Sequence, residues 1–200
     1  METPPDALEF IERYFERSAA FLERVMVFID AGYWRKSLED HFNRVDVDLS
    51  KVVTKLLRGR RLVRTYFYTA KIERPPDEYW RNQQAEQQRL LTALAHQPFV
   101  EVRLGRLQFM GGDAPRQKGV DVLLALDMLR FALKGNYDTA ILISGDGDFA
   151  DIVRMVKDEG RRVEVVTFPG TRAHALLEAC DKSIEVTAEL LEGCWMPKMS

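Results

Sequence analysis

Two short, wholly apolar segments that each end in an acidic turn constrain the fold most strongly. Val25–Ile29 leads into Asp30, and Ala140–Ile143 leads into a Ser-Gly-Asp-Gly-Asp turn at 144–148. Segments of this length without a polar face are typical of strands that are buried on both sides, as in a parallel sheet. Glycine just beyond each segment predicts a turn there. The chain is therefore expected to form a sheet with acids at the carboxyl ends of two strands.

The rest of the chain alternates between strand and helix patterns. Further strands are expected at 62–70, 99–104, 106–110 and 162–167, and helices at 48–58, 76–96, 120–133, 148–159 and 172–179, with a last segment from Ile184. Such alternation favours right-handed crossovers and parallel pairing. The expected fold class is α/β, with a mainly parallel sheet flanked by helices on both faces in a Rossmann-like topology.

The domain organisation is predicted from length and periodicity. A chain of 200 residues fits one domain. Residues 1–23 are expected to form an amphipathic helix, because five apolar side chains recur at steps of three and four. These are Leu8, Ile11, Phe15, Ala19 and Leu22. The helix would pack either on the main body or on a second subunit, and the second arrangement would give a homo-oligomer. Residues 24–192 form the predicted domain, and 193–200 a tail.

Composition excludes several classes of protein. Apolar residues make up 46% and charged residues 30% of the chain, as in folded, water-soluble proteins. We expect no membrane association and a cytoplasmic location, because the sequence has neither a signal peptide nor an apolar stretch of roughly 20 residues. Two cysteines, Cys180 and Cys194, indicate neither a disulfide framework nor a zinc site.

Net charge bears on nucleic-acid binding. A formal charge of −2 argues against coating nucleic acid through overall positive charge. The densest basic run is made up of Lys55, Arg58, Arg60, Arg61 and Arg64. Such a run is more typical of a solvated helix end and loop than of an interface. A local basic surface elsewhere stays open.

The acids that follow the two apolar strands are candidate ligands. In an open parallel sheet, ligands bind beyond the carboxyl ends of the strands, where the order of connections reverses. If the two strands are neighbours, Asp30 and Asp146 face each other there. Asp146 lies between two glycines, which would let its side chain enter a tight site. Asp148, followed by Asp151, suits capping of a helix as well as metal binding.

The apolar helix expected at 120–133 carries two further carboxylates. On a helix, Asp121 and Asp127 point about 120° apart, so one is expected to face the site and the other a bonded partner or water. The helix dipole favours Asp121 in the first turn in any case, whereas a buried Asp127 needs a cation or hydrogen bonds. Converging carboxylates repel one another, and Mg²⁺ or Mn²⁺ suits oxygen ligands and a phosphate substrate.

Three motifs resemble the NYN domain family in its LabA-like branch, in the right order over roughly 24–190. They are Phe28-Ile29-Asp30-Ala31-Gly32-Tyr33, Lys118-Gly119-Val120-Asp121 and Ser144-Gly145-Asp146-Gly147-Asp148-Phe149; the segment at 173–181 is also similar to the family's closing segment. The resemblance implies a PIN-like nuclease fold. It further implies metal-dependent cleavage of RNA, expected to be single-stranded, with Mg²⁺ or Mn²⁺ as the cofactor.

The resemblance also assigns roles to residues. It implies catalytic and metal-binding roles for Asp30, Asp121, Asp146 and Asp148, a further metal-binding position at Asp181, and substrate contacts at Ser144, Lys118 and Tyr33. On this hypothesis Asp30, Asp121 and Asp146 hold the metal and orient the attacking water, and the products are a 5′-phosphate and a 3′-hydroxyl. Many NYN domains carry Asn after the first aspartate, whereas this chain has Gly32 and Tyr33, which leaves substrate contacts there open.

Two other functions are weighed against nuclease activity. The first is a non-catalytic module that binds metal, nucleotide or RNA and acts through protein partners, because fold similarity does not guarantee catalysis. The second is a haloacid-dehalogenase-type phosphatase, suggested by Gly145-Asp146 with Asp151. That class needs an acid two residues after the nucleophile, where this chain has Gly32, so this alternative is the weaker one.

Overall fold

A single sheet organises the molecule. The computed structural model describes residues 23–109, 116–171 and 173–197. Within these residues, seven strands pair in the order β4-β3-β2-β1-β5-β6-β7. Neighbouring strands are parallel except for β3 and β4, which are antiparallel. The predicted α/β class with a mainly parallel sheet is confirmed. The helix predicted at 1–23 lies outside the described residues, apart from the last position.

The elements have the following bounds. The strands are β1 (Arg24–Asp30), β2 (Arg61–Lys71), β3 (Val100–Gln108), β4 (Arg116–Lys118), β5 (Thr139–Ile143), β6 (Arg162–Thr167) and β7 (Lys182–Glu185). The helices are α2 (Ala31–Phe42), α3 (Leu49–Leu57), α4 (Glu78–Ala95), α5 (Val120–Leu133), the 3₁₀ helix η1 (Gly147–Phe149), α6 (Ala150–Asp158), α7 (His174–Ala179) and α8 (Ala188–Leu191).

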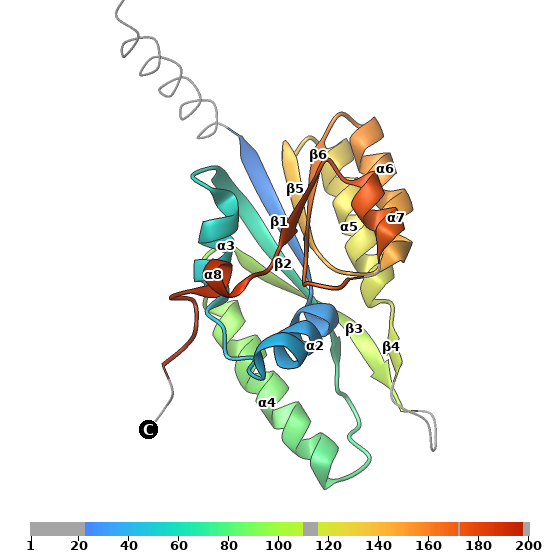
Figure 1. Cartoon of the computed structure of the whole chain (residues 1–200). Helices are drawn as coiled ribbons and strands as arrows, with labels where there is room; N and C mark the ends of the chain where they lie inside the picture. The colour runs from blue at the N-terminus through green and yellow to red at the C-terminus, as the bar shows by residue number, and fades with distance from the viewer. Residues whose placement is uncertain (1–22, 110–115, 172, 198–200) are drawn as a thin grey trace, which may run out of the picture.

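Helices cover both faces of the sheet (Figure 1). Helices α5, α6 and α7 lie on one face, and α2, α3, α8 and the end of α4 lie on the other. Side chains of β1 alternate between the two layers: Phe28 packs toward α5, whereas Val27 and Ile29 pack toward α2 and α3. All three are fully buried. Burial on both faces explains why this strand has no polar side in the sequence.

The order of connections reverses between β1 and β5. Strand β1 pairs with β2 on one side and with β5 on the other, and Ile29 lies opposite Ile143. The strands that end at Asp30 and before Ser144 are therefore neighbours, which is the condition for their acids to face each other. We call the side of the sheet where β1 and β5 end the carboxyl edge, and the opposite side, where they begin, the amino edge. Ligands of open α/β sheets bind at such a reversal, on the carboxyl edge.

The structure differs from the sequence-based expectation in three places. A helix, α2, follows Asp30 where a turn was predicted, because Asp30 itself caps the helix. One continuous strand, β3, replaces the two predicted at 99–104 and 106–110. Gly105 does not interrupt it; a Cβ there would come within 2.6 Å of Val120 Cγ2, so the glycine allows close packing. The three-residue strand β4 lies where neither a strand nor a helix was predicted, and it is too short to show a periodic pattern.

Within the predicted tail at 193–200, the described residues 193–197 contact the domain. Val47 forms an isolated antiparallel bridge with Trp195, and the backbone N–H of Met196 donates to the carbonyl of Asp46 over 3.0 Å. Cys194 is fully buried. The described part of this segment therefore completes the core on the α3 side instead of standing apart from it.

Candidate functional site

Asp30 is fixed where β1 meets α2. Its Oδ1 accepts a hydrogen bond of 3.1 Å from the backbone N–H of Tyr33, which caps the helix. Its Oδ2 accepts one of 3.4 Å from the hydroxyl of Ser144 at the end of β5. Aspartate is a preferred capping residue, so local chemistry and strand pairing both place this carboxylate at the carboxyl edge.

The turn after β5 positions two more acids. Ser144 is fully buried, and its Oγ accepts a hydrogen bond of 3.2 Å from the backbone N–H of Asp146. Asp146 Oδ1 in turn accepts one of 2.9 Å from the N–H of Asp148 and so starts η1. Asp146 is thus the capping acid of this turn, while Asp148 is exposed. Asp151 forms an ion pair of 2.7 Å with Arg154.

The two carboxylates of α5 have different environments. Asp121 is exposed in the first turn, at the carboxyl edge. Asp127 is buried, and it accepts hydrogen bonds from the Tyr68 hydroxyl over 3.1 Å and from Arg103 Nε over 3.3 Å. Arg130 completes its partners with an ion pair of 2.9 Å. As predicted, one acid faces the site and the other has bonded partners.

Electrostatics link the four acids at the carboxyl edge. Burial raises the pKa of Asp30, and the charge of Asp121 raises it further, against the lowering effect of the Tyr33 N–H. Partial burial also raises the pKa of Asp121, followed by the charges of Asp146 and Asp148. Asp121 therefore lies within electrostatic range of the other three acids, Asp30, Asp146 and Asp148. Negative charge gathers here at a cost to the folded protein.

The donor chemistry suits a hard divalent cation, but the side chains do not form a closed cage. All four residues offer carboxylate oxygens, the ligands that Mg²⁺ and Mn²⁺ prefer. Within residues 23–109, 116–171 and 173–197, however, no three His, Cys, Asp or Glu are grouped closely enough to hold a metal ion. One oxygen each of Asp30 and Asp146 accepts a backbone hydrogen bond instead. The residues fit a cation by charge and type, and their side chains would have to converge further to share one.

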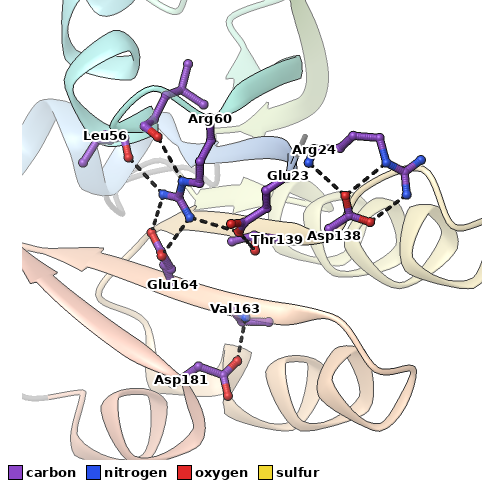
Figure 2. Close-up of polar contacts among 10 residues, drawn as sticks. Glu23, Arg24, Leu56, Arg60, Asp138, Thr139, Val163, Glu164 and Asp181 are labelled. Atoms are coloured by element: carbon purple, nitrogen blue, oxygen red, sulfur yellow. Dashed lines mark hydrogen bonds and ion pairs between the residues drawn. The ribbon is translucent and has the colours of Figure 1, made fainter. Parts of the chain in front are cut away.

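Asp181 is not part of this group. It precedes β7 on the amino edge, where its Oδ2 accepts a hydrogen bond of 2.7 Å from the backbone N–H of Val163 (Figure 2). Its Oδ1 forms an ion pair of 3.1 Å with Lys157. The position of Asp181 therefore contradicts the metal-binding role that the resemblance implied for it. Because β6 and β7 are parallel, a residue that precedes β7 lies at the edge opposite to the other acids.

Tyr33 has a structural position. Its ring lies so close to Gly145 that a Cβ on Gly145 would come within 2.3 Å of Tyr33 Cε2. Its hydroxyl accepts from the backbone N–H of Phe168 over 2.9 Å and lies 2.9 Å from Thr171 Oγ1. Tyr33 thus connects α2 to the turn after β5 and to the loop after β6, and its hydroxyl already has partners in the fold.

Strand β4 carries two polar side chains just before α5 begins. Lys118, predicted to contact substrate, is exposed three residues before Asp121. Gln117 was not predicted from the sequence. A Cβ on Gly32 would lie 2.8 Å from Gln117 Nε2 and 3.3 Å from Asp30 Oδ1, so the Gln117 amide fills the space beside Gly32. The sequence signal for this contact is Gly32, which leaves the space that the Gln117 amide occupies.

Comparison with known proteins adds the following. The model of the NYN domain matches residues 24–190. A crystal structure of a protein of unknown function from Vibrio parahaemolyticus matches with a TM-score of 0.63 and 21% identity, over 84% of this chain and 96% of that one. At this identity the match shows the fold alone. No curated protein matches the chain. None of the helices in the described residues is long and apolar enough to span a membrane.

Proposed function

The chain belongs to the NYN domain family, and from that premise we propose that it is a divalent-metal-dependent endoribonuclease that hydrolyses single-stranded RNA. The observation that carries the proposal is the group of four acids at the carboxyl edge, two of which have a raised pKa because of burial and neighbouring negative charge. Carboxylates perturbed in this way are typical of functional sites.

The acids would hold Mg²⁺ or Mn²⁺. Asp30, Asp121 and Asp146 would provide the ligands, and exposed Asp148 would add negative charge beside them. A divalent cation in such a site stabilises charge on a phosphoryl group and lowers the pKa of water. The chain's own contribution is positional: the Asp30 carboxylate is held by the N–H of Tyr33 and the hydroxyl of Ser144.

Substrate contacts are proposed for the residues around the acids. Lys118, exposed three residues before Asp121, would offer a positive charge to an entering phosphate. Ser144 supports Asp30 and the Asp146 backbone, so its role is to position the acids. In-line attack of water on phosphorus, oriented by these acids, would leave a 5′-phosphate and a 3′-hydroxyl.

The direct test measures cleavage of an end-labelled single-stranded RNA with and without Mn²⁺. Wild type is expected to cleave only with Mn²⁺, and Asp146→Asn to lose roughly 100-fold or more in rate. Asp151→Asn is the matched control, because this carboxylate lies nearby on α6 but is paired with Arg154. Equal rates for wild type and Asp146→Asn contradict the assignment.

A second candidate function is supported by one observation. No three of the described acids lie close enough together to hold one metal ion, which also suits a module that binds metal or RNA weakly without turnover. Calorimetric titration with Mn²⁺, run beside the cleavage assay, separates the two. Binding that Asp146→Asn weakens, with no turnover of RNA or DNA, favours the module. The phosphatase alternative gains no support, since Gly32 stands where its general acid would be.

Several finer expectations stay predictions. These are the LabA-like branch, the cytoplasmic location, the domain limits at 24 and 192, and a homo-oligomer through the N-terminal helix. The oligomer is checked by the mass of the full chain in solution beside a chain that begins at residue 23.

A further inference from the structure

Three basic side chains from separate parts of the sequence lie in one row across the sheet. Lys71, the last residue of β2, is in register with Arg106 of β3, and Arg106 is in register with Lys118 of β4. Residues paired in this way project from the same face of a sheet. With strands about 4.8 Å apart, the row spans roughly 10 Å. It ends at Lys118, three residues before Asp121.

The row is costly unless something negative covers it. Like charges directly opposite each other on neighbouring strands destabilise a sheet. All three side chains are exposed. Among the described residues, Glu73 is the acid near enough to Lys71 for an ion pair, at 3.9 Å, while Arg106 and Lys118 have no such partner. An anion that spans several of these positions would offset the repulsion.

Aromatic side chains lie near the end of β3, the middle strand of the row. The first turn of α4 carries Tyr79 and Trp80, whose rings meet edge to face at 5.4 Å. Trp80 also meets Phe109, the residue after β3, at 5.0 Å and 74°. Tyr79 is 62% exposed, so a ring anchored by Trp80 stands open to solvent. Figure 1 shows the start of α4 and the ends of β2, β3 and β4 on the same side of the molecule as α2.

Resting on the proposed function, we propose that Lys71, Arg106 and Lys118, together with Tyr79, form a track that binds single-stranded RNA and leads it to the acids. The basic row contacts successive phosphates, and Tyr79 stacks on an unpaired base. A basic groove with exposed aromatic rings is the combination that binds single strands, since every base has a π face. An acidic protein would use the charges but would leave the exposed ring without a role.

The test measures affinity for a fluorescent single-stranded RNA by polarisation, in EDTA so that cleavage does not occur. Lys71→Ala/Arg106→Ala is expected to weaken binding at least tenfold at low salt. The slope of log K against log salt should become shallower by about 1.4, because each lost phosphate contact on a single strand contributes about 0.7. Tyr79→Ala should weaken binding about fivefold or more with little change in slope, and Tyr79→Phe should not.

The matched control removes two exposed arginines from the amino edge. Arg61 begins β2 and Arg162 begins β6, and both are exposed. Arg61→Ala/Arg162→Ala changes the net charge as much as the track variant does. Affinity and salt slope close to wild type support the track. An equal loss in both double variants overturns it, because the effect would then come from net charge alone.

Further outcomes separate this inference from the proposed function. If wild type binds RNA through these residues but does not cleave it with Mn²⁺, the track stands and the nuclease assignment fails. If wild type cleaves RNA while the track variant binds and cleaves normally, the track fails. Absence of RNA binding by wild type also overturns the track. Equal affinity for the same RNA annealed to its complement overturns the single-stranded assignment.

Discussion

The two edges of the sheet use charge in opposite ways. At the amino edge, Arg60 is buried between Glu23 and Glu164, with an ion pair of 2.8 Å to Glu164 (Figure 2). Arg24 and Asp138 form another pair there, at 2.7 Å. At the carboxyl edge, Asp121 lies close enough to other acids for their charges to raise its pKa, and the side chains of the basic row are exposed. The ion pairs of the amino edge stabilise the fold, and the carboxyl edge is where the proposed metal and RNA would bind.

The pKa values express the same contrast. The hydrogen bond from Arg24 lowers the pKa of Asp138 below its ordinary value of 3.8. Burial raises the pKa of Asp30 and Asp121 above that value. The fold favours the ionised carboxylate of Asp138 at the amino edge and disfavours the ionised carboxylates of Asp30 and Asp121 at the carboxyl edge. Raised carboxylate pKa values of this kind are common at functional sites.

The basic residues follow the same division. The densest basic run in the sequence lies around the start of β2, and three of its five side chains, those of Lys55, Arg60 and Arg64, have partners within the fold. Arg64 pairs with Glu101 at 2.8 Å, and Lys55 donates to the carbonyl of Glu192 over 2.7 Å. The proposed RNA track instead combines single basic residues from three strands. Local density of positive charge therefore did not locate the candidate interface.

Removing Arg60 should have the largest effect on stability. Arg60→Met leaves Glu23 and Glu164 without their cation, and breaking a buried pair costs about 3–5 kcal/mol. Unfolding in urea measures it, with the exposed Arg61→Ala as a control expected to stay within about 0.5 kcal/mol. Cleavage per folded molecule should not change. An Arg60→Met protein as stable as wild type would refute the stabilising role of the amino edge.

A methyl group at Gly145 should have the next largest effect. The new Cβ would lie 2.3 Å from the ring of Tyr33, and overpacking of this kind costs about 1–3 kcal/mol. Cleavage should fall as well, because the Asp146 turn would shift. Gly147→Ala is the control, since nothing lies within 4 Å of its Cβ. Equal stability and activity of both variants would show that the turn is not tightly held.

Neutralising Asp30 should increase stability while abolishing activity. Asparagine keeps the cap on α2, and it removes a partly buried charge beside Asp121. We expect Asp30→Asn to gain roughly 1 kcal/mol without divalent cations and to lose RNA cleavage. Asp138→Asn, at the amino edge, should change stability in the opposite direction and retain cleavage. Thermal unfolding and the Mn²⁺ assay measure both; a destabilised Asp30→Asn would remove the contrast between the edges.

The pH dependence should be the smallest effect and should differ in sign. Because the pKa of Asp138 is lowered in the fold, its contribution is present above pH 3.8 and is lost as the pH falls below that value. Because the pKa of Asp30 is raised, its penalty is present at neutral pH and is relieved as the pH falls toward 3.8. Asp138→Asn should flatten the first change and Asp30→Asn the second, in denaturation curves at stepped pH. Identical profiles for both variants would contradict the assigned directions.

Much of the fold could be predicted because it depends on local patterns. The apolar segments before Asp30 and Ser144 fixed two buried strands, and the apolar helix with two acids was expected at the bounds that α5 has. The alternation of strands and helices indicated parallel pairing. Helix α2 and strand β4 were not foreseen, since one begins from a capping contact and the other is three residues long.

The sequence by itself therefore determined which segments are buried, the α/β class and the acids that end the strands. The reason is that burial and periodicity depend on the order of apolar and polar residues within each segment. Tertiary structure alone decided which of these side chains meet. Strand order put Asp181 at the opposite edge, packing on Gly145 positioned Tyr33, and β4 brought Gln117 to Gly32. Register aligned Lys71, Arg106 and Lys118. Contacts between residues far apart in the chain depend on how strands pair, and no local pattern contains that pairing.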